Sequence, residues 1–487
     1  MTVGRDVRWL DVVLPRSRGR SVDIVFNRAS VVPLALNILE EHASHIRGLF
    51  FVDLDVNTYE FLLALMKIRM HVLEEVMVHR CLAAPEQGPP TSFRVDAPNF
   101  PALSILRCAS AQVNWTASFL RRLTTLSVMD APIFHSSFTF DDFLCILQEL
   151  SDGSLRRLEL YNSFPFYDNT HHTTDELFES DRIVNLPNLQ TLSLVHSRAS
   201  PIHALLSHMH LSFHIELFVY FVGCVGHDGA PELPGLLDIL PRDPRCIPTY
   251  QHSYSAYITA ERVPDPQGDF LSVSSRSEKV GFVSVVMGIV GANSSRWSYS
   301  FDDIIMDFVH LFRHSKLTLR SLKLGVEDMV PTEVLDNGAV VITPKHTMTT
   351  IGLEMLFNAF PNITALEARV VDLEWNCPMT MVDALWTYRE RTPPHEGAHG
   401  IPSNRAPRPE CVLPRLALLC LLGVSCSSEF VDALQACIWA RRWVYKSNLL
   451  EFRIQLLDQF GKALSVEDQY NIVRPLEDVV RNIVCIP

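Results

Sequence analysis

The sequence predicts an α/β fold of short parallel strands joined by helices, and a repeated leucine spacing is the first observation that predicts it. The spacing LxxLxL is strict in four places, which begin at Leu155, Leu189, Leu319 and Leu416. Its last two leucines lie two residues apart on a strand, so both point to one face of a sheet. One unit cannot bury them alone, whereas stacked units can. We therefore expect a leucine-rich-repeat solenoid, an irregular right-handed horseshoe with parallel strands on its concave face and helices on its convex face.

A proline-containing unit is the second observation. It consists of an apolar residue, Pro, any residue, an apolar residue, two further residues and Leu, and it starts at Phe100, Leu186, Phe360 and Leu413. Proline at the same place in every copy argues against chance recurrence. Degenerate copies of LxxLxL begin at Ile46, Leu73, Leu103, Leu123, Ile215, Ile363 and Leu449. In a chain that is 47% hydrophobic, the even spacing of these copies counts for more than their letters.

Helical periodicity between the predicted strands is the third observation. Apolar residues recur at three- and four-residue offsets from Phe140 to Leu147 and from Ile304 to Phe312. Thr139 with Asp142, and Ser300 with Asp303, have the spacing of a capping box at a helix start. Strands that alternate with helices in this way predict parallel strands joined by right-handed crossovers.

The predicted organisation has three parts. Residues 1–222 are expected to hold N-terminal repeats, and residues 223–300 an irregular insertion with an added β segment. Residues 301–487 are expected to hold C-terminal repeats and a capping helix. Within them, 392–411 contains five prolines and two glycines without periodicity, which predicts a disordered loop.

Composition and charge exclude several classes of protein. The formal net charge is −13, with 42 Lys and Arg against 55 Asp and Glu, which disfavours nucleic acid as a partner. Arg and Asp interrupt every apolar stretch of residues 1–20, so no secretory signal is predicted. The longest uncharged apolar stretches fall short of the ~20 residues that span a bilayer, so no membrane segment is expected. Eleven cysteines without a CxxC pair indicate reduced thiols. We therefore expect a cytoplasmic or nuclear protein.

Motifs of nucleotide binding and hydrolysis are missing from the sequence, so no enzyme, cofactor or metal is predicted. Histidines cluster at positions 203, 208, 210 and 214, but a loop after a helix explains them better than a metal site does. A hydrolase whose catalytic residues meet only in space is kept as a distant alternative.

Side chains between the strand leucines are expected to face the concave surface. Their mixture of charged, amide and aromatic groups suits a protein or peptide partner, and the other interpretation is a solvated face. The predicted partner-binding residues are Arg157, Glu159, Tyr161, Lys323, Glu367, Arg369, Glu451 and Arg453.

Short segments along most of the chain carry a family resemblance. They are Leu10–Ser17 with Val22–Phe26, His45–Leu49, the units LPNLQTLSL and LPRLALLCL, and Leu464–Asp468. Together they resemble the fungal F-box/leucine-rich-repeat proteins, especially those of mushroom-forming species. The resemblance implies repeats that present a protein substrate, and an N-terminal F-box that docks on the adaptor of a cullin-type ubiquitin ligase. The chain departs from that pattern because only nine residues precede Leu10, too few for an F-box helical segment.

The function expected from these observations is that of a non-enzymatic protein-interaction solenoid, the substrate-recognition part of an F-box-type ubiquitin ligase receptor. An F-box-less scaffold or decoy without ligase association is the alternative. The start methionine could also lie downstream of the true one.

Overall fold

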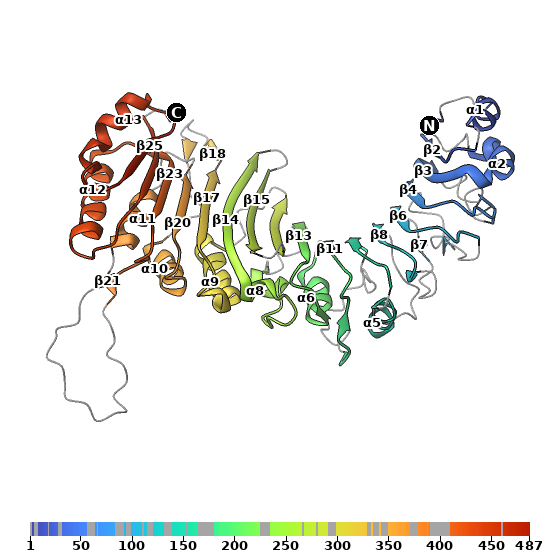
Figure 1. Cartoon of the computed structure of the whole chain (residues 1–487), viewed down its shortest axis with the longest axis horizontal. Coiled ribbons are helices and arrows are strands. Elements are labelled where there is room, and N and C mark those ends of the chain that lie inside the picture. The colour runs from blue at the N-terminus through green and yellow to red at the C-terminus, as the bar shows by residue number, and fades with distance from the viewer. Residues whose placement is uncertain are drawn as a thin grey trace. The chain divides into compact units, whose positions relative to one another are not determined.

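The structure is a computed structural model with two compact units, Met1–Tyr220 with Arg245–Ile247 and Phe221–Pro244 with Pro248–Pro487. It describes residues 2–3, 8–17, 19–27, 32–55, 64–65, 67–82, 92–93, 99–109, 112–113, 120–130, 139–151, 153–163, 180–224, 234–264, 267–278, 281–290, 299–328, 333–334, 340–341, 349–370, 377–386, 388–389, 410–458 and 461–487. Each unit combines helices with a mostly parallel sheet, which confirms the mixed α/β class (Figure 1).

Parallel strands pair in chain order in the first unit. They are β1 (Thr2–Val3), β2 (Val22–Phe26), β3 (Ile46–Asp55), β4 (Glu75–Leu82), β6 (Ile105–Ala109), β8 (Thr125–Met129), β9 (Arg157–Tyr161) and β11 (Thr191–His196). Helices α1 (Leu10–Arg16), α2 (Val32–Glu41), η2 (Ala43–His45), α5 (Phe140–Glu149) and α6 (Ala199–Ser207) lie between or after them. Two short parallel pairs, β5 (Ser92–Phe93) with β7 (Gln112–Val113) and β10 (Val184–Asn185) with β12 (Met209–His210), accompany this sheet.

The register of these strands stacks their apolar side chains into two buried spines. The first spine is Ile24, Leu49, Val76, Leu106, Leu126, Leu158 and Leu192, and the second is Phe26, Phe51, Val78, Cys108, Val128, Leu160 and Leu194. Burial of each large member contributes roughly 1.5–3 kcal/mol, which no isolated strand would gain. The core of the unit therefore runs along the stack of strands.

The second unit begins within β13 (Glu216–Cys224). An antiparallel meander of β14 (Ser253–Pro264), β15 (Gln267–Ser277) and β16 (Phe282–Val290) joins a parallel ladder through β14. The ladder continues with β17 (Ser321–Asp328), β20 (Ala365–Val370), β23 (Leu418–Ser425), β24 (Glu451–Leu457) and β25 (Asn482–Cys485). Two short antiparallel pairs, β18 (Glu333–Val334) with β19 (Val340–Val341) and β21 (Tyr388–Arg389) with β22 (Glu410–Cys411), lie outside it.

Helices follow most strands of this second ladder. They are α7 (Leu236–Ile239), α8 (Thr249–His252), α9 (Phe301–Phe312), η5 (Arg313–Ser315), α10 (Thr350–Ala359), α11 (Cys377–Trp386), α12 (Ser428–Trp443), α13 (Val466–Val473) and η6 (Arg474–Leu476). Consecutive helices from α9 to α13 contact one another and lie along one side of the strands (Figure 1). The ladder has buried spines of its own, Ala256, Leu322, Leu366, Leu419 and Phe452 beside Ile258, Leu324, Ala368, Leu421 and Ile454.

The four proline units share one local structure. In each, the amide of the second apolar residue donates to the carbonyl of the first: Leu103 to Phe100, Leu189 to Leu186, Ile363 to Phe360 and Leu416 to Leu413, at 3.0–3.3 Å. Proline is therefore at the second position of a four-residue turn, where its fixed φ is suited. The strand begins two residues after the second apolar residue in every copy.

Both predicted capping boxes are confirmed. Thr139 Oγ1 accepts the Asp142 amide while the Asp142 carboxylate accepts the Thr139 amide, at the start of α5. Ser300 and Asp303 do the same at the start of α9.

One sequence expectation is wrong in detail. The unit that starts at Ile215 was expected to bury Phe218 and Tyr220, but both are exposed, and the alternate residues from Leu217 to Phe221 are buried instead. A shift of one residue exchanges the two faces of a strand, and an irregular unit leaves that choice to its neighbours. The predicted loop 392–411 ends in β22, and its part 392–409 lies outside the described residues.

The sequence predicted three parts, and the structure has two compact units. The units separate after Tyr220, and residues 245–247 belong to the first unit. The β14–β16 meander lies within the segment 223–300, for which an added β segment was expected. Among the described residues, no helix combines the length and the apolar character needed to cross a membrane.

Candidate functional site

The side of the second ladder that faces away from its buried spines carries the clearest arrangement of polar groups. Register places Tyr257, Lys323, Glu367, Cys420 and Arg453 at one level on β14, β17, β20, β23 and β24. We call these five residues the charged row. Neighbouring strands lie ~4.8 Å apart, so adjacent members of the row are within reach of one another.

Two ion pairs order the charges of this row. Lys323 Nζ lies 2.8 Å from Glu367 Oε2, and Arg453 Nε lies 2.5 Å from Glu451 Oε1 on the same strand. The hydrogen bond to Glu451 raises the pKa of the Arg453 guanidinium further above its usual value. Such partly exposed pairs contribute ~0.2–1 kcal/mol each, so their main effect is to hold the four side chains in defined positions.

An apolar column separates the two ion pairs. It consists of the outward residues of β23, Leu418, Cys420 and Leu422, of which Cys420 is buried and the two leucines are half-buried. Burial, with the nearby Glu367 carboxylate as a second cause, raises the pKa of the Cys420 thiol to about 11. The thiol is therefore neutral at physiological pH and acts as a small apolar group, since only a thiolate is a good nucleophile.

A glycine on β17 makes room for Tyr257, the aromatic member of the row. A Cβ built on Gly325 would lie 2.9 Å from Thr259 Cγ2 and 3.2 Å from Tyr257 Oη, so a larger residue here would displace one of these two side chains. Tyr257 remains 36% exposed, and Arg369 on β20 is exposed as well. Together the charged row, Glu451, Arg369, Leu418 and Leu422 form what we call the polar face of the second unit.

Five of the eight predicted partner-binding residues therefore lie together, namely Lys323, Glu367, Arg369, Glu451 and Arg453. Tyr257 is not among the predicted residues because it lies in the predicted insertion 223–300, outside the predicted repeats. Cys420 and its two leucines were not predicted because they are apolar. Their alternation with Leu419 and Leu421 was the available signal: Leu418 and Cys420 lie within LPRLALLCL, and Leu422 follows it directly.

The other three predicted residues lie on β9 in the first unit, and one of them differs from expectation. Glu159 is buried, with 7% of its side chain exposed, although it was expected to face solvent. Arg157 reaches its carboxylate at 2.5 Å, and register places the buried Ser127 and Ser193 on either side of it. Small neighbours and a covering guanidinium therefore remove this carboxylate from water.

Tyr161 is the third predicted residue on β9, and it is half-buried. Burial raises the pKa of its hydroxyl above the usual value, and the charge of Glu159 adds to that effect. Arg157, Glu159 and Tyr161 thus form a packed patch whose charges already have partners.

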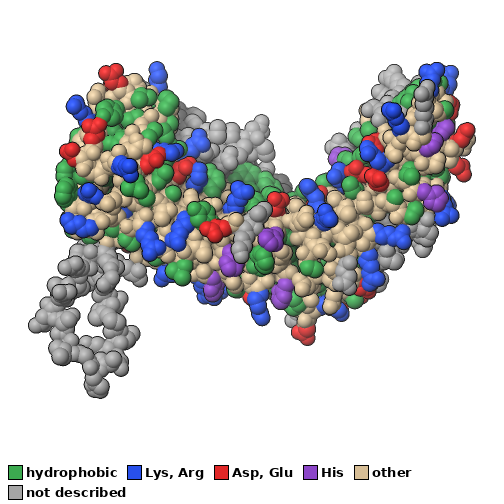
Figure 2. Space-filling model, viewed as in Figure 1, with side chains coloured by type: hydrophobic (Ala, Val, Ile, Leu, Met, Phe, Trp, Pro, Cys, Tyr) green, Lys and Arg blue, Asp and Glu red, His purple; other side chains and the backbone are tan. Residues whose placement is uncertain are grey.

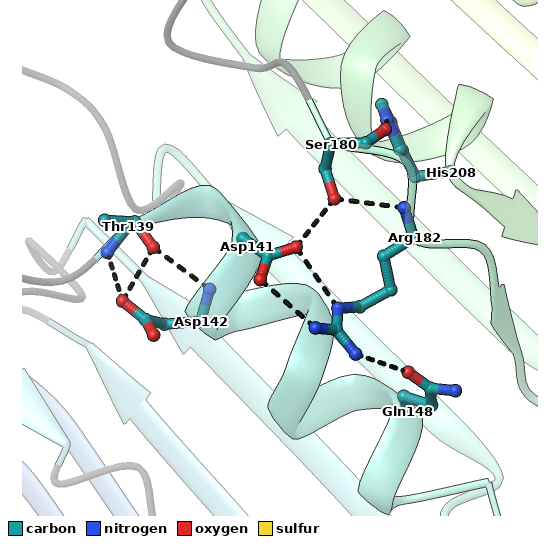
Figure 3. A network of polar contacts seen from close by, with 7 residues as sticks. All are labelled: Thr139, Asp141, Asp142, Gln148, Ser180, Arg182 and His208. Atoms are coloured by element: carbon teal, nitrogen blue, oxygen red, sulfur yellow. Dashed lines mark hydrogen bonds and ion pairs between the residues drawn. The ribbon is translucent and has the colours of Figure 1, made fainter.

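A second polar cluster, in the first unit, joins residues 180–182 to α5 through hydrogen bonds (Figure 3). Arg182 donates two hydrogen bonds to the Asp141 carboxylate, both at 3.2 Å, and one to Gln148 on α5 at 2.9 Å. Ser180 also donates to Asp141, at 2.7 Å. These bonds, that of Arg182 first, lower the pKa of Asp141. The residues border an open depression of about 500 Å³. Their polar groups form hydrogen bonds with one another.

His208, one of the four clustered histidines, also joins these elements. Both ring nitrogens of His208 lie 2.7 Å from backbone carbonyl oxygens, those of Ala204 on α6 and of Ser180. Its ring also packs edge-on against Phe140 of α5. Within the part of the chain that the structure describes, no three His, Cys, Asp or Glu side chains are placed to hold a metal ion.

Comparison with known proteins gives no family. No protein-family model matches the chain, and no curated protein matches it.

Proposed function

We propose that this protein is a non-enzymatic leucine-rich-repeat solenoid that binds a protein partner on the polar face of its second unit. The observation that carries this proposal is the charged row with the apolar column of β23 at its centre. A centre poor in charge with charged and aromatic residues around it is the usual composition of a protein interface.

The shape of the face favours a macromolecular partner over a small molecule. Its side chains stand on five adjacent strands, which span roughly 19 Å at the usual strand spacing. Small ligands bind in concave pockets that enclose most of their surface, whereas proteins bind to broad faces. Tyr257, Arg369 and Arg453 are of the residue types that contribute most to protein interfaces.

We further propose that the chain belongs to the fungal F-box/leucine-rich-repeat proteins and presents substrates to a cullin-type ubiquitin ligase, in the cytoplasm or nucleus. Support comes from the four proline units, which all form the same turn before a strand of the ladders. Two of them are the LPNLQTLSL and LPRLALLCL segments on which the resemblance rests.

Affinity purification with quantitative mass spectrometry tests both proposals. The wild type is compared with Lys323→Glu/Arg453→Glu, which reverses two cations of the charged row. The matched control is Arg313→Glu/Lys316→Glu, which lowers the net charge equally at exposed positions after α9. Partners of the polar face should fall at least about tenfold with the first variant and remain unchanged with the control.

Equal recovery of all partners by the three proteins would contradict binding on the polar face. The ligase role has its own outcome: an adaptor and a cullin should co-purify with all three proteins, because the ligase proposal does not place their contact on the polar face. Recovery of substrates without adaptor or cullin would support the scaffold instead. Thermal melting within a few degrees of the wild type shows that each variant is folded.

A further inference from the structure

Helix α12 presents a second surface, on the opposite side from its buried face. Its inward residues Phe430, Leu434, Cys437 and Ile438 are buried. Its exposed residues recur at three- and four-residue spacing and form what we call the outer stripe: Glu429, Asp432, Ala436, Trp439 and Trp443. Such spacing places all five on one side of the helix, as in the seam of a coiled coil.

Two tryptophans on the outer stripe are unusually open to solvent. Trp443 is 55% exposed and Trp439 is 37% exposed, and their ring centroids lie 6.2 Å apart. Val444, which follows the helix, is 62% exposed. Lys446 Nζ lies 5.9 Å from the centroid of the Trp443 ring. Adjacent exposed tryptophans beside a cation are typical of surfaces that a partner covers.

Charge is divided between the two ends of α12. Glu429 and Asp432 lie near its beginning, and Arg442 and Lys446 lie at or just after its end. The helix dipole favours this order in any helix, but it does not account for the exposed tryptophans. Hydrophobic and basic side chains lie near one another at the left edge of Figure 2, where Figure 1 shows α12.

Helices α11 and α13 add residues to the acidic end and to the aromatic end of this surface. β20, β23 and β24 are parallel, so α11, α12 and α13, which follow them, begin at the same edge of the sheet. The exposed Glu467 and Asp468 in the first turn of α13 therefore add to the acidic end. Trp386 at the end of α11 is 44% exposed and adds to the aromatic end.

We infer that the outer stripe is covered by the same stripe of a second copy of this chain, with the two α12 helices antiparallel about a two-fold axis at Ala436. A two-fold axis requires a surface that is complementary to itself. Here it places Glu429 of each copy opposite Trp443 of the other and Asp432 opposite Ala440, so the acidic end of one helix lies against the end of the other that carries Arg442 and Lys446. The small Ala436 at the centre allows the helix axes to approach to about 8 Å. This inference is independent of the polar face.

The predicted dimer is weak. Sixteen residues make a helix about 24 Å long, so a single pair of helices with its flanking residues gives an interface at the small end of the known range. A dissociation constant in the micromolar range, about 1–100 µM, is expected for such a contact.

Sedimentation velocity with a pair of charge-exchanged variants tests the inference. The first variant is Glu429→Lys/Asp432→Lys and the second is Arg442→Glu/Lys446→Glu. In an antiparallel pair each variant alone opposes like charges, so each should dimerise at least about tenfold more weakly than the wild type. An equimolar mixture restores opposite charges at both ends and should form a heterodimer.

Three results would overturn the inference: a wild type that remains monomeric up to about 200 µM, variants that dimerise like the wild type, or a mixture that remains monomeric. Trp443→Ala should weaken the dimer without a change of charge. Lys323→Glu/Arg453→Glu is the matched control, and it should dimerise like the wild type because both residues lie on the polar face.

Discussion

Two arginine–glutamate pairs make the same contact in different surroundings. Arg157 with Glu159, and Arg453 with Glu451, each lie two positions apart on one strand, and their shortest contact is 2.5 Å in both cases. The Glu159 side chain is 7% exposed, whereas that of Glu451 is 28% exposed. The first carboxylate therefore depends on its arginine and its neighbours, because water reaches it little.

The first prediction compares these two glutamates. Glu159→Gln should lower the free energy of unfolding by about 1.5–3 kcal/mol, because it weakens a charge-assisted hydrogen bond of a buried group. Glu451→Gln, the matched control, should cost less than about 1 kcal/mol because its pair is partly exposed. Urea unfolding of both variants measures the difference. Equal costs would show that the burial of Glu159 has no energetic consequence.

At the scale of elements, a buried histidine closes the end of β11. His196 is 2% exposed, and its Nδ1 accepts the Arg198 amide at 2.9 Å, just before α6 begins. Burial lowers its pKa from 6.5 to about 4. The folded protein therefore holds the neutral imidazole under conditions in which the unfolded chain binds a proton.

The pH dependence of stability follows from this shift. The contribution of His196 is fully present above pH 6.5 and is lost as the pH falls toward 4, because the unfolded state then binds more protons than the folded state. Its slope approaches about 1.4 kcal/mol per pH unit within that window. Urea unfolding at several pH values should give a shallower acid loss for His196→Asn than for the wild type. Identical slopes would contradict the assignment.

Arg441, a buried arginine of α12, joins that helix to the segment between β22 and β23. The Arg441 guanidinium of α12 donates to the carbonyls of Val412 and Leu413 at 2.8 and 2.7 Å, just before β23. Leu413 has a φ of +49°, which is unfavourable for leucine, and it lies in the turn of a proline unit. Two charge-assisted bonds to this turn help to hold that conformation.

At the scale of the whole molecule, the sequence could predict the buried faces of strands and the starts of helices, because both depend on local spacing. The leucine spacing placed Leu158, Leu160, Leu322 and Leu324 on buried faces, because a strand repeats every two residues. Capping boxes predicted the starts of α5 and α9, because their hydrogen bonds join residues three apart.

What the sequence could not predict depends on neighbours distant along the chain. Glu159 is buried among Ser127 and Ser193, which come from the strands on either side. Tyr257 stands beside Lys323 only because β14 pairs with β17. Arg441 is buried because two carbonyls of another segment accept its hydrogen bonds, and an arginine near the end of a helix is otherwise expected to be exposed.

Site-specific photocrosslinking tests the central claim, that a protein partner lies on the polar face of the second unit. A photoreactive phenylalanine analogue replaces Leu422 on β23 in one protein. In the control it replaces Leu317, which is 69% exposed and follows η5. If a partner lies on the polar face, it should crosslink at position 422 and not at position 317. Crosslinks only at position 317, or equally at both positions, would contradict it.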